Sequence, residues 1–131
     1  MASRESLMQI LAIGHDTSMR GAGLSMREAL ARAAYSSHRG SLNVEDLLAV
    51  IKVDPRYVDQ WCAYSEDKRT STGWYLLREG EVGEIGVSAS IACFESIEEA
   101  TAIYVLRELD YWAGVGEPAS NRLHRPRFAR R

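Results

Sequence analysis

The spacing of apolar residues changes at Asp54-Pro55, and this change constrains the fold more than any other feature. Before it, apolar residues recur at helical intervals in three segments. These are residues 3–14, 26–35 and 44–52. After it, three segments alternate as strands do, and a final one returns to helical spacing. These are residues 56–64, 73–79 and 81–94, followed by 96–113. The order predicts an α+β fold with N-terminal helices, a three-stranded antiparallel meander and a C-terminal helix packed on the sheet.

Local signals mark where the helices begin. Ser25 with Glu28, and Ser96 with Glu99, have the Ser-x-x-Glu spacing of a capping box, and Asn43 is placed to cap the helix that follows it. Residues 56–64 allow two interpretations. Their aromatic and β-branched content favours a strand, whereas Tyr57, Trp61 and Tyr64 also fit a helix that starts at Pro55. We expect the strand and keep the helix as the alternative.

The segment 81–94 alternates apolar and polar residues. The side expected to face the core carries five residues: Ile85, Val87, Ala89, Ile91 and Cys93. The side expected to face water carries Glu84, Gly86, Ser88 and Ser90. This alternation is typical of a sheet with one buried and one solvated face.

The 131 residues suit one domain, which we place at residues 1–117 with a helical part (1–54) and a sheet-plus-helix part (55–117). Residues 118–131 form a basic tail without periodicity, and we expect it to be mobile. No apolar run reaches the roughly 20 residues that span a bilayer, and no secretory signal is recognisable, so a cytoplasmic location is expected. Cys62 and Cys93 are predicted to be buried thiols in a reducing compartment.

Charge is unevenly distributed along the chain, although the net charge is only −2. Residues 79–117 hold nine acidic side chains and one arginine, a net −8, whereas residues 118–131 hold five arginines and no acid. Such separation bears on which partners the chain attracts.

The chain offers weak evidence for catalysis. His15-Asp16 are adjacent residues that seldom face each other, and His38 and His124 have no neighbour at a metal-ligand spacing. The segment GAGLSM before a helix lacks the preceding strand and the lysine of a phosphate-binding loop. We therefore expect no enzyme activity, no cofactor and no metal.

The acidic residues are the better candidates. Residues 65–73 are predicted to be a hairpin turn, and a second hairpin and the start of the last helix carry further glutamates, with Glu108 and Asp110 near that helix's end. Together they are expected to form one negative face that binds a basic protein. The candidate contacts are Glu66, Asp67, Glu79, Glu81, Glu84, Glu98 and Glu99.

The layout of SEDKRTSTGWYLL followed by FESIEEATAIYVLREL resembles small α+β immunity proteins that neutralise bacterial polymorphic toxins. The resemblance covers roughly residues 55–113 and contains no diagnostic motif. It implies a non-catalytic protein that binds a cognate toxin, such as a nuclease, and blocks its active site or substrate path.

The alternative is a nucleic-acid-associated accessory protein that uses the tail, since arginines contact phosphates and Phe128 can stack on a base. Its candidate contacts are Arg122, Arg125, Arg127, Arg130 and Arg131.

Overall fold

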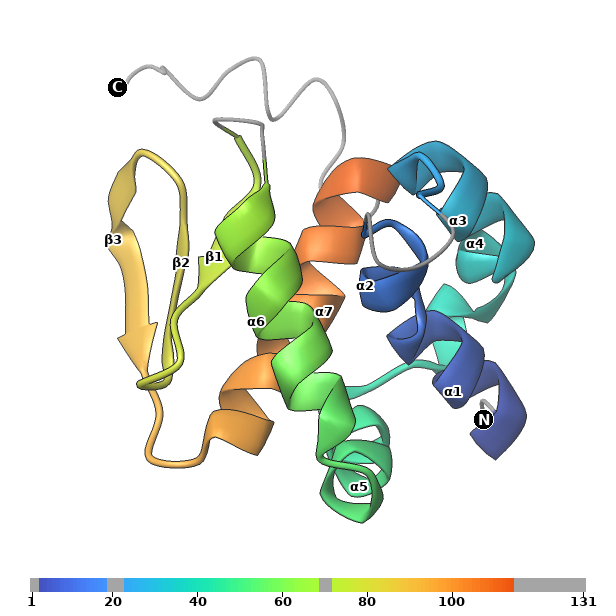
Figure 1. Ribbon diagram of the computed structural model, residues 1–131, viewed down its shortest axis with the longest axis horizontal. Coiled ribbons are helices and arrows are strands. Elements are labelled where there is room, and N and C mark those ends of the chain that lie inside the picture. The colour runs from blue at the N-terminus through green and yellow to red at the C-terminus, as the bar shows by residue number, and fades with distance from the viewer. Residues whose placement is uncertain (1–2, 19–22, 69–71, 115–131) are drawn as a thin grey trace.

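The computed structural model describes residues 3–18, 23–68 and 72–114. The N-terminal elements are α1 (Arg4–Leu11), α2 (Ile13–Asp16), α3 (Met26–Arg32), α4 (Tyr35–His38), the 3₁₀ turn η1 (Arg39–Ser41) and α5 (Val44–Val53). They are followed by α6 (Arg56–Asp67), β1 (Trp74–Leu76), β2 (Glu81–Glu84), β3 (Val87–Cys93) and α7 (Ile97–Ala113). Figure 1 shows the sheet at one end of the molecule and the N-terminal helices at the other. The predicted α+β class, with helices first and a final helix on a three-stranded antiparallel sheet, is confirmed.

The predicted helix starts are confirmed. Ser25 and Glu28 form a reciprocal capping box, and Asn43 accepts a hydrogen bond from the Asp46 N–H. The predicted box at Ser96 is half formed: Ser96 accepts from the Glu99 N–H, but its hydroxyl donates to Glu98. The second predicted helix ends earlier than expected. Ala34 has a left-handed backbone (φ 52°), which separates α3 from α4.

Residues 56–64 are helical, so the preferred strand prediction is wrong and the alternative is right. Pro55 stands at the N-cap with φ −64°, a value its ring favours and a helix accepts. Tyr57 and Trp61, one turn apart, are buried on the same side of α6. The aromatic content that favoured a strand instead fills the core between helices, because β propensity depends strongly on packing context.

The meander is built from residues 74–93 and is shorter than predicted. Its strands pair antiparallel in the order β1-β2-β3. The expected single strand 81–94 is in fact a hairpin of β2 and β3. Gly86 lies between them with φ 85°, a left-handed value that glycine adopts readily.

Helix α7 is the centre of the core. It packs against α5, α6, β1, β2 and α3, and it ends at Gly114 in a left-handed conformation. Trp61 from α6 is fully buried and donates a hydrogen bond from Nε1 to the Leu11 carbonyl, 2.8 Å away. Among the described helices, none has the length and apolar character needed to cross a membrane.

The contact between Trp61 and Gly14 yields a stability prediction. The sequence placed Gly14 at a helix end, but it lies inside α2, where a Cβ would come 2.8 Å from two Trp61 ring carbons. The buried indole cannot move aside freely. We therefore expect Gly14→Ala to lower the free energy of unfolding by about 1–3 kcal/mol in urea denaturation.

Gly40 is the matched control. A Cβ there meets no described atom within 4 Å. Gly40→Ala should leave stability unchanged or raise it by up to about 1 kcal/mol. Equal stability of the two variants would show that the α2–α6 contact is looser than described.

Candidate functional site

The sheet has two edges, and only one of them faces the helices. The strand order makes β1 and β3 the edge strands. Helices α6 and α7 pack against β1, and α7 also packs against β2, whereas β3 pairs with β2 on the outer side of the molecule (Figure 1). The β1 edge is therefore covered by helices and the β3 edge points outward.

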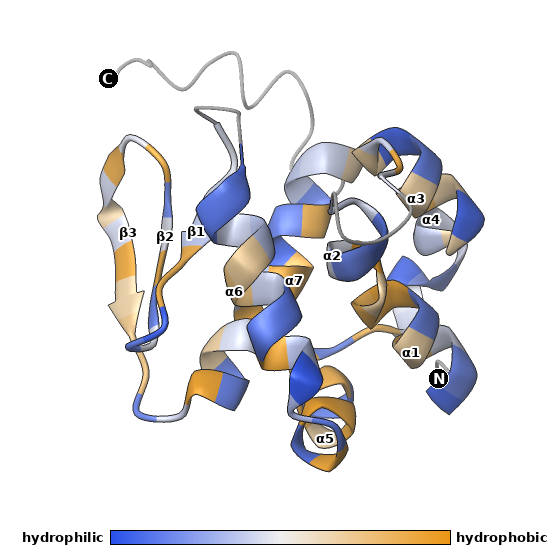
Figure 2. Cartoon of the chain, in the orientation of Figure 1, coloured by the Kyte–Doolittle hydropathy of each residue, from blue (hydrophilic) through white to orange (hydrophobic). Residues whose placement is uncertain are grey.

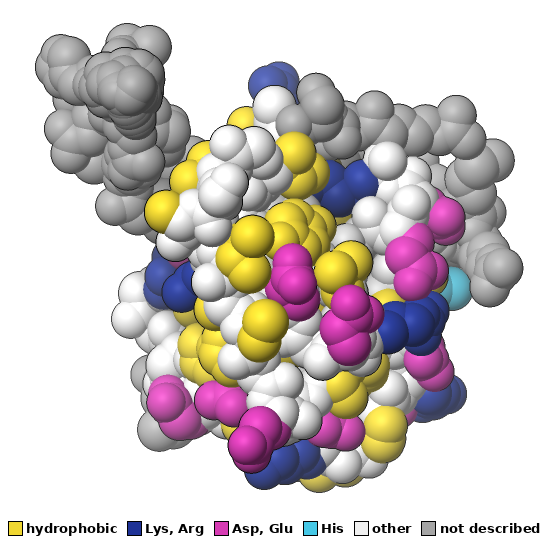
Figure 3. Space-filling model, turned by 90° about the vertical axis from the view of Figure 1, so that its left-hand side faces the viewer, with side chains coloured by type: hydrophobic (Ala, Val, Ile, Leu, Met, Phe, Trp, Pro, Cys, Tyr) yellow, Lys and Arg dark blue, Asp and Glu magenta, His cyan; other side chains and the backbone are white. Residues whose placement is uncertain are grey.

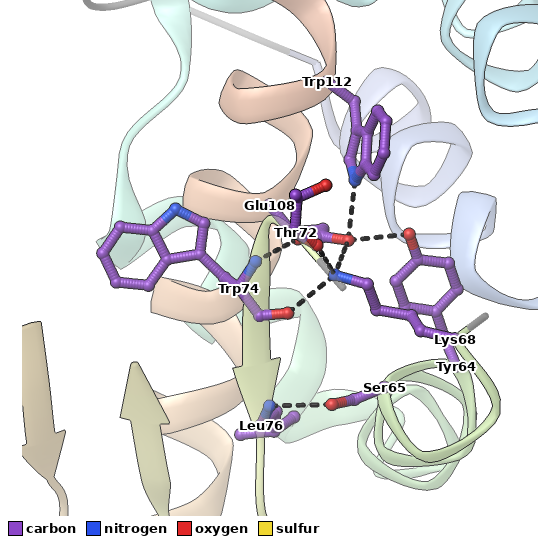
Figure 4. Close-up of polar contacts among 8 residues, drawn as sticks. All are labelled: Tyr64, Ser65, Lys68, Thr72, Trp74, Leu76, Glu108 and Trp112. Carbon is purple, nitrogen blue, oxygen red and sulfur yellow. Dashed lines mark hydrogen bonds and ion pairs between the residues drawn. The ribbon is translucent and has the colours of Figure 1, made fainter. Parts of the chain in front are cut away.

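Side chains from the helices close the β1 edge by hydrogen bonding. The Trp74 N–H donates to Glu108 Oε1 (2.8 Å), and the Trp74 carbonyl accepts from Lys68 Nζ (2.9 Å). The Leu76 N–H donates to Ser65 Oγ (2.8 Å). Figure 4 shows these contacts along the strand. They occupy three of the backbone groups that a further strand would need.

Glu108 is the centre of this closure. Its side chain is fully buried, and Oε2 lies within 2.9 Å of Lys68 Nζ while accepting hydrogen bonds from Tyr64 Oη (2.8 Å) and Trp112 Nε1 (2.9 Å). Burial, reinforced by the nearby carboxylate, raises the pKa of Tyr64 well above its ordinary value, so this hydroxyl remains a donor. A Cβ on Gly73 would come 2.8 Å from both charged groups. Both carboxylate oxygens are thus engaged within the fold.

The β3 edge has no comparable cover. The Phe94 N–H donates to the Gly80 carbonyl at the end of the β2–β3 pairing. Hydrogen-bonding direction alternates along the regular end of this ladder, where Ala92 is opposite Val82, so the backbone groups of Ile91 and Cys93 on either side of Ala92 point away from β2. The register shifts farther along, toward Val87. Within the described residues, no hydrogen bond reaches these outward groups. They are the free edge of β3.

The apolar side of β3 is exposed, which corrects the prediction that it would be buried. Val87 and Ile91 are 43% and 49% exposed, and Cys93 is exposed as well, whereas Cys62 is buried as predicted. The reason is that the helices cover the other face of the sheet, the one on which Leu76 and Val82 are buried. Figure 2 shows hydrophobic residues on this outermost strand, and Figure 3 shows hydrophobic side chains exposed on this side of the molecule, with acidic ones among them.

Glu81 lies on the same face of the sheet as this apolar strand. It pairs with Cys93 across β2 and β3, and directly opposed residues share a face. Tyr75, which pairs with Gly83, reaches across that glycine so that its hydroxyl donates to Glu81 Oε2 at 2.6 Å. We call Tyr75, Glu81, Ala89, Ile91 and Cys93 the outer face.

The remaining candidate glutamates lie at the ends of the sheet. Glu79 is exposed in the β1–β2 turn, near the end where β3 leads into α7, and Glu84 pairs with Val87 at the other end. Glu98 and Glu99 are in the first turn of α7, where the helix dipole favours acidic residues. Among the described residues, none of these four, nor Glu81, has a basic partner in an ion pair.

Other acidic residues do not belong with this group. Glu66 and Asp67 end helix α6 and are not at a hairpin tip, and Glu66 is paired with Arg78 (2.9 Å). Glu108 is buried beside Lys68. Asp110 binds Arg39 through two hydrogen bonds and also accepts one from the Tyr35 hydroxyl. Glu66, Glu108 and Asp110 are thus neutralised within the fold and add little to a negative surface, whereas Asp67 is exposed at the end of α6, apart from the glutamates of the sheet.

The histidines and Cys62, the remaining candidates for catalysis or metal binding, are not brought into a reactive arrangement in the described part of the chain. His15 is exposed on α2 and His38 is on α4, and no metal-binding group of His, Cys, Asp and Glu occurs in the described part of the chain. Burial raises the pKa of the Cys62 thiol, which keeps it protonated and unreactive. His124 and the arginines of the tail lie outside the described residues.

Comparison of the chain with protein-family models, with curated proteins and with solved structures gives no match.

The closure of the β1 edge can be tested by breaking the buried ion pair. Lys68→Met leaves the Glu108 carboxylate buried without a cation, and we expect it to lower the free energy of unfolding by about 3–5 kcal/mol. The double variant Lys68→Met/Glu108→Gln should recover a large part of that loss, because no charge stays buried. Arg78→Met is the control, since its ion pairs are exposed and worth at most about 1 kcal/mol. A small effect of Lys68→Met in chemical denaturation would contradict the described cluster.

The contact between Tyr75 and Glu81 predicts a pH effect. The hydrogen bond to the carboxylate raises the pKa of Tyr75 to about 12 from an ordinary 10. The folded chain holds this proton more tightly than the unfolded one, so the contact stabilises the fold below pH 10 and loses its effect as the pH rises through 12. In ¹³Cζ NMR titrations, Glu81→Gln should return the pKa of Tyr75 toward 10, and Glu79→Gln should leave it unchanged. Titration near 10 in the unaltered chain would contradict the contact.

Proposed function

We propose that this chain is a non-enzymatic protein-binding module that binds a basic partner through the outer face and the glutamates beside it. We further propose that the partner is a toxin domain such as a nuclease, which the chain occludes as an immunity protein would. The layout of residues 55–113 supports this second step as a resemblance.

The observation that carries the proposal is the combination of apolar exposure on β3 and uncompensated charge on the neighbouring strand β2. Ile91 and Val87 expose apolar surface, and Glu81 and Glu84 lie on the adjacent strand without ion-pair partners among the described residues. An apolar centre with a charged margin is the common composition of protein interfaces. A margin of one sign favours a partner of the opposite sign.

The acidic margin is tested by charge reversal. The partner to use is the product of the neighbouring reading frame, since an immunity protein is expected to be encoded beside its toxin. We expect Glu81→Lys/Glu84→Lys to raise the Kd for that protein by at least about tenfold, mainly through slower association, because steering by opposite charges is lost. Surface plasmon resonance at several salt concentrations measures both rates. In the unaltered chain, the association rate should fall as salt rises.

Glu5→Lys/Glu45→Lys is the matched control, because it changes the net charge equally at exposed positions in the first turns of α1 and α5. It should leave the Kd within about threefold of the unaltered value, which corresponds to less than about 1 kcal/mol. Equal effects of the two double variants, or binding that does not depend on salt, would rule out a role for Glu81 and Glu84 in attracting the partner.

The tail provides the comparison with the nucleic-acid alternative. Replacing its five arginines by glutamine in the full-length chain should leave binding to the basic partner intact. Loss of nucleic-acid binding in this variant, with no partner bound by the unaltered chain, would favour the alternative instead.

A further inference from the structure

We infer that the partner binds by adding an extended segment to the free edge of β3 as a fourth strand, and that this segment alternates apolar residues with lysine or arginine. The inference rests on the proposed function and specifies how the same surface is used. It requires a β3 edge that is able to pair, side chains that an added strand would contact, and a reason to favour a basic segment over a second copy of this chain.

The β3 edge is able to pair. Residues 87–93 contain no charged residue and no proline, two of the features that protect exposed edge strands. The β2–β3 register shifts between Val82 and Glu84, so the regular part of the edge is the stretch around Ile91 and Cys93. The outward backbone groups of Ile91 and Cys93 are free within the described residues, whereas on β1 the Trp74 N–H and C=O and the Leu76 N–H are bonded to Glu108, Lys68 and Ser65. One edge of the sheet is thus closed by specific hydrogen bonds and the other is left open.

The side chains beside this edge indicate the chemistry of the added strand. A strand paired with β3 lies about 5 Å from it and about 10 Å from β2. Its residue opposite Cys93 would be aligned with Glu81, since Cys93 and Glu81 are themselves opposed. A long basic side chain at that position spans the gap to the carboxylate. Residues opposite Ile91 and Ala89 would meet apolar neighbours.

Charge favours a basic segment over a second copy of this chain. Two copies paired through β3 would bring together the same glutamates, which have no ion-pair partner among the described residues. Like charges near an interface oppose association, whereas a basic segment is attracted. Backbone hydrogen bonds along the edge supply affinity, and the alternating side chains supply selectivity.

Synthetic peptides test the inference directly. The probe is Thr-Lys-Thr-Ile-Thr-Val-Thr-Lys-Thr, which presents lysine and apolar residues on one face of a strand. Two further versions carry N-methyl groups on alternate backbone amides, on the threonines or on the other residues. Their charge and side chains are unchanged, but each has lost the hydrogen-bond donors along one edge.

Strand addition predicts that one methylated peptide binds the full-length chain at least about tenfold more weakly than the parent and that the other binds like the parent. Equal binding of all three peptides, with loss of binding in Glu81→Lys/Glu84→Lys, would overturn strand addition and leave charge-driven docking standing. Absence of any charge-dependent binding, by the peptides or by the basic partner, would overturn the proposed function as well.

Amide hydrogen exchange locates the site without relying on a variant. Saturating parent peptide should slow the exchange of the Ile91 and Cys93 amides and leave that of Ala92, which faces β2, unchanged. No protection at Ile91 and Cys93 would overturn the inference. The same amides protected in the free chain, together with a dimer in analytical ultracentrifugation, would assign the edge to a second copy instead.

A variant at the edge gives an independent readout. Because the Ile91 N–H points outward, Ile91→Pro removes that donor and leaves the pairing with β2 in place. It should abolish peptide binding, whereas Ile91→Thr, which keeps the N–H, should retain at least part of it. Full binding by a folded Ile91→Pro chain would count against strand addition. If that variant does not fold, the exchange measurement decides.

Discussion

The buried carboxylate of Glu108 is the interaction on which the arrangement of the second half of the chain depends. A carboxylate taken out of water is tolerated only with a counter-charge and hydrogen-bond donors. Glu108 obtains them from Tyr64 and Lys68 at the end of α6, from the Trp74 backbone in β1 and from Trp112 one turn along α7. A single side chain therefore holds α6, α7 and β1 together, and it binds β1 through an outward backbone N–H on the edge of that strand.

Much of the fold could be predicted from local sequence. The caps at Ser25, Asn43 and Ser96 act within one turn, so short-range patterns identify them. The prediction failed at residues 56–64, where aromatic residues suit a strand and a helix equally and only tertiary packing decides. It also missed the hairpin within 81–94, because Gly86 fits an alternating pattern as well as it fits a turn.

Less of the candidate site could be predicted. The expectation of one negative face overlooked that Glu108 lies four residues after Tyr104 and four before Trp112, on the apolar stripe of α7; that position is a recognisable sign of burial. The Lys68 partner, 40 residues earlier, carries no such sign. The exposure of the apolar side of β3 could not be predicted either. The alternation of apolar and polar residues shows that the two faces of the strand differ, but it does not show which face the helices cover. The contact of Tyr75 with Glu81 follows from a pairing register that the sequence alone does not specify.

A sheet with one blocked side can grow in a single direction. If two copies ever met through their outer strands, each would present its helix-sealed first strand to the exterior, and no third copy could join. An uncharged outer strand is usually a hazard because it templates endless polymers. Here the blocked β1 edge limits strand pairing to two copies. The chain therefore has a free β3 edge without the risk of forming fibres through this sheet.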